Sequence, residues 1–272
     1  MNGAKLTKIQ FLKAMNEIAP DSLAEEWDNV GMLIDCGKTE YGKILFALTL
    51  TENVAEQAEK AGADLVVTHH PVMLSGVRRL DGETDESRAI IRLIKNGISH
   101  FAAHTNLDCA NIGTNAVTAR LVGLIDAVPL CGNGMGRIGT LNPAVTLSEL
   151  GGIVGRALSP ADLRIAGDPK QIIRKLAVVT GSGMSLAKEA KAAGADAILT
   201  GDARYHNAAE AAGYGLAVID AGHFATERPA MSHLIQGLQE HFDTLQCKLA
   251  IMTELCLARE DDAFWSARAA VE

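Results

Sequence analysis

Apolar and polar positions follow one another along this chain in blocks of helix and strand length. Within residues 43–70, an apolar run at Ile44–Leu48 leads into an alanine-rich amphipathic stretch that ends at Gly62, and a second apolar run follows at Leu65–Val67. This order predicts a strand, a helix with a glycine at its C-terminus, and another strand. Because both strands are continuously apolar, they indicate a parallel sheet that is buried on both faces.

The same block occurs a second time. Residues 175–202 align with residues 43–70 without a gap, with apolar runs at Leu176–Val179 and Ala197–Leu199 and a glycine at Gly194. Chance similarity between alanine-rich helices is the alternative explanation, but a repeat of this length is typical of a fold built twice. We therefore expect an α/β protein made of two similar, interlinked α/β lobes that are related by internal duplication, with a metal site between them.

The chain is long enough for two modest domains, each with its own core. We place the first lobe at residues 1–130 and the second at residues 131–272, with the C-terminal segment packing back on the first lobe. At this boundary lies the glycine-rich segment Cys131–Gly139. Such a composition predicts a flexible junction or a ligand-binding loop.

Charge and composition narrow the classes of partner. The formal net charge is −8, and no large cluster of basic residues occurs, so a main role in nucleic-acid binding is not expected. No apolar stretch has the length of a membrane span, and the N-terminal residues lack the apolar core of a signal peptide. The five cysteines contain no CxxC pair, which argues against a disulfide scaffold. We expect a cytoplasmic protein.

Side chains that bind metals follow three of the predicted strands directly. In chain order they are His69 and His70, then His104 and Asp108, then His223 and Glu227. Ligands of α/β sheets bind at the carboxyl ends of the strands, where these side chains fall. Imidazole and carboxylate donors together suit Zn, Mn, Fe or Co, and six donors exceed the needs of one tetrahedral ion. The pattern predicts two divalent metal ions per chain, about 3.5–4 Å apart.

The spacing of these residues adds detail. A histidine and an acidic residue four positions apart at a helix start lie on one face, and we favour Asp108 over Glu227 as the carboxylate that bridges the ions. Neighbouring side chains on a regular strand point to opposite faces. His69 and His70 therefore lie where the strand breaks, or they bind different ions. Each histidine alone also fits a structural role; the joint pattern favours a metal site.

Several of these segments resemble the NIF-three-like family, whose members are also called GTP cyclohydrolase I type 2 homologues or dinuclear-metal-centre proteins. The resemblance covers nearly the full chain and is carried by Glu25–Gly31, Gly62–Pro71, Ala103–Asp108, Gly136–Gly139, Gly181–Gly183, Thr200–His206 and Asp220–Glu227. It implies that the six residues named above are metal ligands. It also implies a homohexamer, a trimer of dimers whose metal sites face an internal cavity, without the extra domain of longer members.

Two positions depart from the family pattern. Thr49 stands where many members carry an aspartate at the strand end, and Val72–Leu74 replaces the usual Leu-Ile-Phe type of sequence after the His-His-Pro motif. We expect that neither departure touches a proposed ligand. On this reading they alter the fit of the substrate and leave metal binding intact.

Other residues near the motifs are candidates for contact with a substrate. Glu26, Trp27 and Asp28 line the cavity in one interpretation, whereas in another Trp27 packs inside the protein. His206 follows the strand end that is equivalent to the histidine pair, so we propose it as a general acid or base, with a structural histidine as the alternative. The Gly181–Gly183 turn either offers backbone N–H groups to a phosphate or is a plain turn.

These features favour a metal-dependent hydrolase in which metal-activated water attacks a nucleotide-like or other phosphate-containing small molecule. In that mechanism Asp108 holds the two ions together, and His206 or a spare imidazole moves protons. The resemblance suggests GTP, opened at its imidazole ring, while a phosphoester fits the same chemistry. The alternative is a non-catalytic, ring-shaped metal-binding scaffold or regulatory protein, in which the ions have no open coordination position. DNA binding through the ring would need a basic lining.

Overall fold

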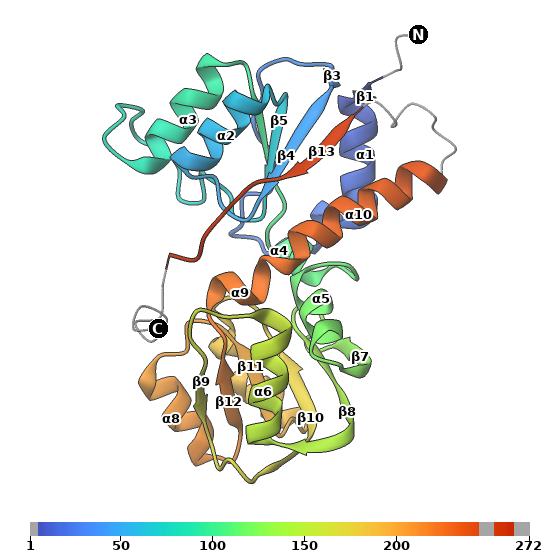
Figure 1. Ribbon diagram of the computed structural model, residues 1–272, viewed down its shortest axis with the longest axis vertical. Coiled ribbons are helices and arrows are strands. Elements are labelled where there is room, and N and C mark those ends of the chain that lie inside the picture. Colours follow the sequence, from blue (N-terminus) through green and yellow to red (C-terminus); the bar gives the residue numbers. More distant parts are fainter. Residues whose placement is uncertain (1–4, 245–252, 264–272) are drawn as a thin grey trace. The chain divides into compact units, whose positions relative to one another are not determined.

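The structure is a computed structural model that describes residues 5–244 and 253–263. It consists of two compact units, and Figure 1 labels their helices and strands. Unit 1 contains residues 1–112 and 231–260, and unit 2 contains residues 113–230 and 261–272. The lobe boundary expected at residues 130 and 131 stays a prediction. Cys247 lies outside the described residues.

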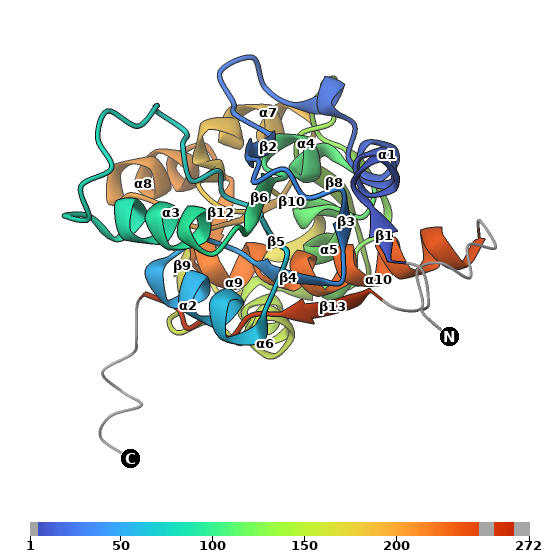
Figure 2. The ribbon, with the colours of Figure 1, turned by 90° about the horizontal axis from the view of Figure 1, so that it is seen from above.

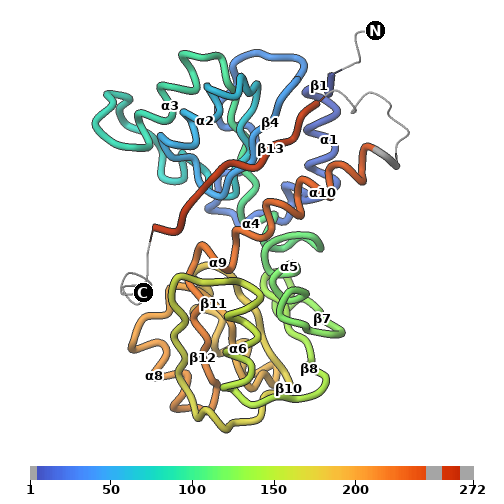
Figure 3. Tube along the Cα trace, viewed as in Figure 1, coloured from blue at the N-terminus to red at the C-terminus, as the bar shows by residue number. Residues whose placement is uncertain are grey.

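Unit 1 is organised around a five-stranded sheet with the order β13-β4-β5-β6-β2. The three central strands and β13 run parallel, and β2 is antiparallel to β6. Strand β13, which comes late in the chain, pairs with β4 along its length (Figure 3). A separate short sheet pairs β1 with β3. The strands of unit 1 are β1 (Leu6–Thr7), β2 (Gly31–Ile34), β3 (Glu40–Tyr41), β4 (Lys43–Ala47), β5 (Leu65–Thr68), β6 (Ser99–Ala102) and β13 (Glu254–Leu257).

Helices cover both faces of this sheet, as Figures 1 and 2 show. Helices α2 and α3 bury Val54, Ala58 and Leu93 against one face. On the other face, Phe11 of α1 packs edge-to-face on Phe101. This double cover explains why the strands are continuously apolar. The helices of unit 1 are α1 (Lys8–Ile18), η1 (Asp21–Leu23), α2 (Glu52–Ala61), α3 (Asp85–Lys95), α4 (Thr105–Cys109) and most of α10 (Pro229–Thr244).

Unit 2 contains a six-stranded sheet with the order β7-β8-β10-β11-β12-β9. Its strands β10, β11 and β12 are parallel, and the other three join them in antiparallel pairs. The first part of the glycine-rich segment predicted as a junction or ligand loop, residues 131–136, forms the turn between β7 and β8, where the backbone N–H of Cys131 donates to the Met135 carbonyl. The strands are β7 (Ile125–Pro129), β8 (Arg137–Thr146), β9 (Arg164–Ala166), β10 (Ile172–Val178), β11 (Ala197–Thr200) and β12 (Ala217–Asp220).

The sheet of unit 2 is also covered on both faces. Leu150 and Val154 of α6 pack with one set of strand residues, and Ala190 and Ala211 of α7 and α8 pack with the other set. Successive residues of β10 alternate between these two cores, as the period of a strand requires. The helices of unit 2 are α5 (Thr114–Leu121), α6 (Leu147–Leu158), η2 (Gly183–Leu186), α7 (Ala187–Ala192), α8 (Tyr205–Gly213) and α9 (His223–Glu227).

The two sheets share part of their strand order. In unit 1 the order β2-β6-β5-β4 has three parallel strands and one antiparallel strand at the β6 side, and in unit 2 the order β9-β12-β11-β10 has the same pattern. The outer strands differ, because β4 pairs with a parallel strand and β10 with an antiparallel one. The expectation of an α/β fold is confirmed. None of the helices that the structure describes has the length and apolar character needed to cross a membrane.

Candidate metal centre

Three histidines meet at the carboxyl end of the unit 1 sheet. Strand β5 stops at Thr68, so His69 and His70 lie beyond its regular pleat, and His104 lies just before α4. The ring centroids of His69 are 5.0 Å from those of His70 and His104. One ligand atom from each of the three lies within 4.8 Å of the others, a grouping that could hold a metal ion. The prediction that the strand breaks at the histidine pair is confirmed.

Each of these rings is held through its Nδ1 atom. Nδ1 of His69 is 2.8 Å from the carbonyl oxygen of Ala103, which can only accept, so this nitrogen carries the proton. Nδ1 of His104 is 2.9 Å from Oδ1 of Asp28. A hydrogen bond at Nδ1 fixes the ring and leaves the lone pair of Nε2 to bind a metal, which is the usual arrangement of histidine ligands.

The buried side chain of Asp28 holds the ring of His104 through a hydrogen bond. Its carboxylate also accepts hydrogen bonds from the backbone N–H, at 3.0 Å, and the hydroxyl of Thr105. Burial alone would raise the pKa of Asp28, but the hydrogen bonds from His104 and Thr105 outweigh it and hold that pKa well below its usual range. Asp28 is therefore an anion that orients the His104 ring. The sequence interpretation that it lines a cavity missed this contact.

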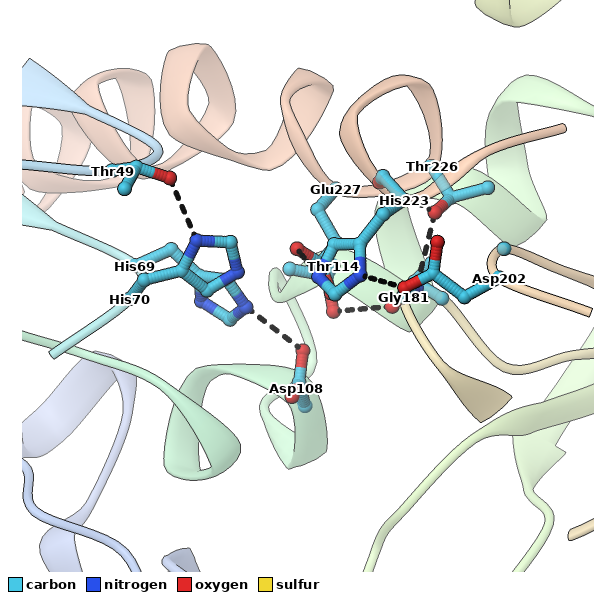
Figure 4. Close-up of polar contacts among 12 residues, drawn as sticks. Thr49, His69, His70, Asp108, Thr114, Gly181, Asp202, His223, Thr226 and Glu227 are labelled. Atoms are coloured by element: carbon cyan, nitrogen blue, oxygen red, sulfur yellow. Dashed lines mark hydrogen bonds and ion pairs between the residues drawn. The ribbon is translucent and has the colours of Figure 1, made fainter. Parts of the chain in front are cut away.

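Thr49 contacts a proposed ligand, contrary to expectation. Its Oγ1 atom is 2.8 Å from Nδ1 of His70, as Figure 4 shows. The carboxylate of Glu260 holds this strand end by accepting the backbone N–H groups of Leu48 and Thr49, at 2.7 and 3.0 Å. The expectation was wrong because β4 and β5 are paired neighbours, so residues just past their ends lie side by side.

Asp108 lies near the histidines on the first turn of α4. Its Oδ1 atom is 3.6 Å from Nε2 of His69, and its side chain is largely buried (Figure 4). The backbone N–H of Asp108 donates to the carbonyl of His104, so the helix starts between these two residues as predicted. A carboxylate this close to the imidazoles adds an oxygen donor to the unit 1 cluster.

In unit 2, His223 and Glu227 form a pair one helical turn apart on α9. Nε2 of His223 is 3.0 Å from Oε2 of Glu227, whose side chain is buried, and Nδ1 is 2.7 Å from Oδ2 of Asp202 (Figure 4). The hydrogen bond to Glu227, helped by Asp202, raises the pKa of His223 to about 9 although burial opposes it. Without a metal, this imidazole therefore holds a proton between two carboxylates at neutral pH.

Two glycines allow the carboxylate of Glu227 and the start of α9 to approach the sheet. Gly181 has φ +61°, and a Cβ atom built on it would lie 2.1 Å from Oε1 of Glu227. A Cβ atom on Gly201 would lie 2.6 Å from the backbone nitrogen of His223. Sequence reasoning missed this role, although Gly201 directly follows β11 and Gly181 lies three residues after the end of β10, positions that gave a signal.

The other candidates from the sequence are the Gly181–Gly183 turn, His206 and Trp27. The amides of Gly181 and Gly183 donate to Thr226 and Thr200 inside unit 2, so the phosphate interpretation of this turn is not supported and the plain-turn alternative fits. His206 is exposed on the first turn of α8, where its ring contacts Tyr205. Its role as an acid or base stays a prediction. Trp27 is 61% exposed, so it does not pack inside the unit.

Comparison with known proteins gives consistent matches. The family model described as Duf34/NIF3 (NGG1p interacting factor 3) matches residues 6–255. A Clostridium perfringens protein named GTP cyclohydrolase 1 type 2 homolog is 35% identical over 240 residues, covering 86% of this chain and 92% of its own length. A Streptomyces coelicolor protein of the same name is 36% identical over 231 residues, covering 81% of each. The solved structure of a Bacillus cereus protein related to NIF3 has a TM-score of 0.89 at 22% identity and covers 96% of this chain and 99% of its own.

Proposed function

The chain belongs to the Duf34/NIF3 family, and from this premise we propose that it is a metal-dependent hydrolase with a dinuclear centre that acts on a nucleotide-like substrate. The observation that carries the proposal is the fixed orientation of the histidines. His69, His104 and His223 each use Nδ1 for a hydrogen bond to an oxygen acceptor, which is how proteins prepare an imidazole to bind a metal through Nε2.

We propose that both units supply ligands to the same two ions. The ligand set is the one predicted from the sequence: His69, His70, His104, Asp108, His223 and Glu227. The matched strand order of the two sheets and the ungapped repeat support an origin by internal duplication, in which the equivalent ends of β6 and β12 both carry ligands. Three imidazoles with one carboxylate, and one imidazole with another carboxylate, give a mixed set suited to Zn, Mn, Fe or Co.

The metals would supply Lewis acidity, which lowers the pKa of bound water towards 7. The protein residues then have distinct tasks. Asp28, Asp202 and Thr49 hold the imidazole rings in place, and Asp108 is the carboxylate that we favour for joining the two ions. His223 and Glu227 would hold a metal, which would take the place of the proton on Nε2 of His223, and Asp202, which binds Nδ1 of that ring, can take part in proton movement. His206 is our candidate for proton transfer to or from the substrate.

The names of the relatives point to GTP as the first substrate to test. The experiment is to reconstitute the protein with Zn, Mn or Fe and to follow opening of the guanine imidazole ring by ultraviolet absorbance. We expect metal-dependent turnover, a loss of more than roughly 100-fold in His104→Ala together with metal content, and a loss of activity with full metal content in His206→Ala. Asp21→Asn, an exposed change, is the matched control.

Two bound ions without turnover on GTP or on a panel of phosphoesters would contradict the hydrolase. That result would favour the alternative, a non-catalytic metal-binding scaffold or regulatory protein. The homohexamer, a trimer of dimers, is a proposal that rests on family membership, and the cytoplasmic location is a proposal that rests on the sequence. Sedimentation of the metal-loaded protein tests the assembly.

A further inference from the structure

Trp27 is a large apolar side chain left open beside the metal-binding histidines of unit 1. Its indole is 61% exposed, and its ring centroid is 6.0 Å from that of His104, with an angle of 79° between the rings. This edge-to-face contact uses only part of the indole surface. An indole offers a large, rigid π face, which stacks readily on planar ligands.

The loop that carries Trp27 is fixed at several points. On one side, the backbone N–H of Glu25 donates to Oγ1 of Thr105 at 2.9 Å, and Asp28 binds His104. On the other side, Nδ2 of Asn29 donates to the carbonyl of Met73 at 2.8 Å. The loop therefore connects the segment after His70 with the segment that begins at His104. These hydrogen bonds fix the position of the Trp27 backbone relative to both ligand-bearing segments.

We infer that Trp27 is the stacking platform for a planar heteroaromatic ring, of the nucleobase class, in the substrate of this site. This inference rests on the proposed function and adds the substrate contact that it lacks. The ring stacks on the indole while the rest of the molecule reaches the metals that His104 helps to bind. The interaction is insensitive to the exact base, because every base presents a π face.

The test uses the full chain loaded with metal, in a Trp265→Phe background, so that Trp27 is the single source of tryptophan emission. GTP and inorganic triphosphate are the two probes. GTP is expected to quench the emission, and triphosphate, which has no base, is not. Trp27→Leu should weaken GTP binding by roughly ten-fold or more, and Trp27→Phe by less, with triphosphate affinity and metal content unchanged. Ile9→Ala, which changes another exposed apolar side chain, is the control.

Equal GTP affinity in Trp27→Leu and the parent would overturn the inference, as would GTP binding without quenching or no GTP binding at all. Shielding of the indole from acrylamide in the ligand-free assembly would also overturn it, because another copy of the chain would then cover Trp27. A different result tests the proposed function. GTP that stacks on Trp27, with no turnover of GTP or of the phosphoester panel, contradicts the hydrolase and leaves the binding role in place.

Discussion

The carboxyl ends of the two sheets follow one plan but carry different donors. In the ungapped repeat, Gly201 and Asp202 of unit 2 occupy the positions of His69 and His70 in unit 1. Asp202 hydrogen-bonds His223, whereas His70 belongs to the group that could itself bind a metal. Unit 1 thus gathers several imidazoles, and unit 2 surrounds one imidazole with carboxylates.

A second pair of equivalent positions shows the same divergence. Thr49 of unit 1 bonds Nδ1 of His70, and its counterpart Gly181 has no side chain, which makes room for the carboxylate of Glu227. The first strand end has a side chain that contacts the ring of His70, and the second has no side chain and so leaves room for Glu227. Equivalent strand ends of the two sheets therefore differ in the side chains they carry, and these side chains decide which groups can lie there.

Gly181→Ala should give the largest effect. Alanine is strained at the φ of +61° that this position has, and its Cβ atom would lie 2.1 Å from Oε1 of Glu227. We expect a loss of about 2–4 kcal/mol in the free energy of unfolding and a lower metal content. Chemical denaturation and elemental analysis measure the two. Gly213→Ala is the control: no atom lies within 4 Å of its Cβ position, and alanine favours a helix, so stability should hold or rise. Equal stability and metal content in the two variants would contradict the role of Gly181 in making room for Glu227.

Asp28→Asn tests the support of His104 in unit 1. The neutral amide makes the imidazole less basic, and its NH₂ group would oppose the donors of Thr105. We expect metal affinity to fall by about 10- to 100-fold, as for other changes behind a histidine ligand. Competition with a chelator gives the affinity. An unchanged value in Asp28→Asn would mean that His104 does not bind metal.

The charge around His223 predicts a pH dependence of stability in the metal-free protein. The folded pKa of about 9 exceeds the usual value near 6.5, so the stabilisation is complete below pH 6.5 and is lost as the pH rises through 9. Allowing for the partial exposure of the ring, we expect a loss of about 1–2 kcal/mol. Unfolding titrations at pH 6.5 and 9.5 measure it. His223→Gln should remove this pH dependence; if the parent shows none, the ion pair is not formed.

Thr49→Val should give the smallest effect, because the hydroxyl is a neutral partner for His70. We expect metal affinity to fall by less than about ten-fold, with Thr49→Ser close to the parent. The same chelator competition applies. If Thr49→Ser fell as far as Thr49→Val, the effect would come from packing and the hydroxyl would have no role at Nδ1.

The sequence predicted the strands and the histidine clusters because both follow local rules. Continuous apolar runs indicate buried strands, and a histidine with an acidic residue four positions later indicates a helix start. It did not predict the contacts of Asp28 with His104 and of Thr49 with His70, because these join residues far apart in the chain. The packing role of Gly181 was also missed, since a glycine at a strand end is common in turns. Such contacts depend on register, which periodicity does not reveal.

We propose that both units supply ligands to one dinuclear centre. The most direct measurement is the Mn²⁺ content and electron paramagnetic resonance spectrum of the parent, His104→Ala and His223→Ala. We expect two ions per chain with a spin-coupled signal, which disappears in each variant because each removes a proposed ligand of the shared centre. Retention of a coupled pair in His223→Ala would contradict it, since unit 1 would then hold both ions alone.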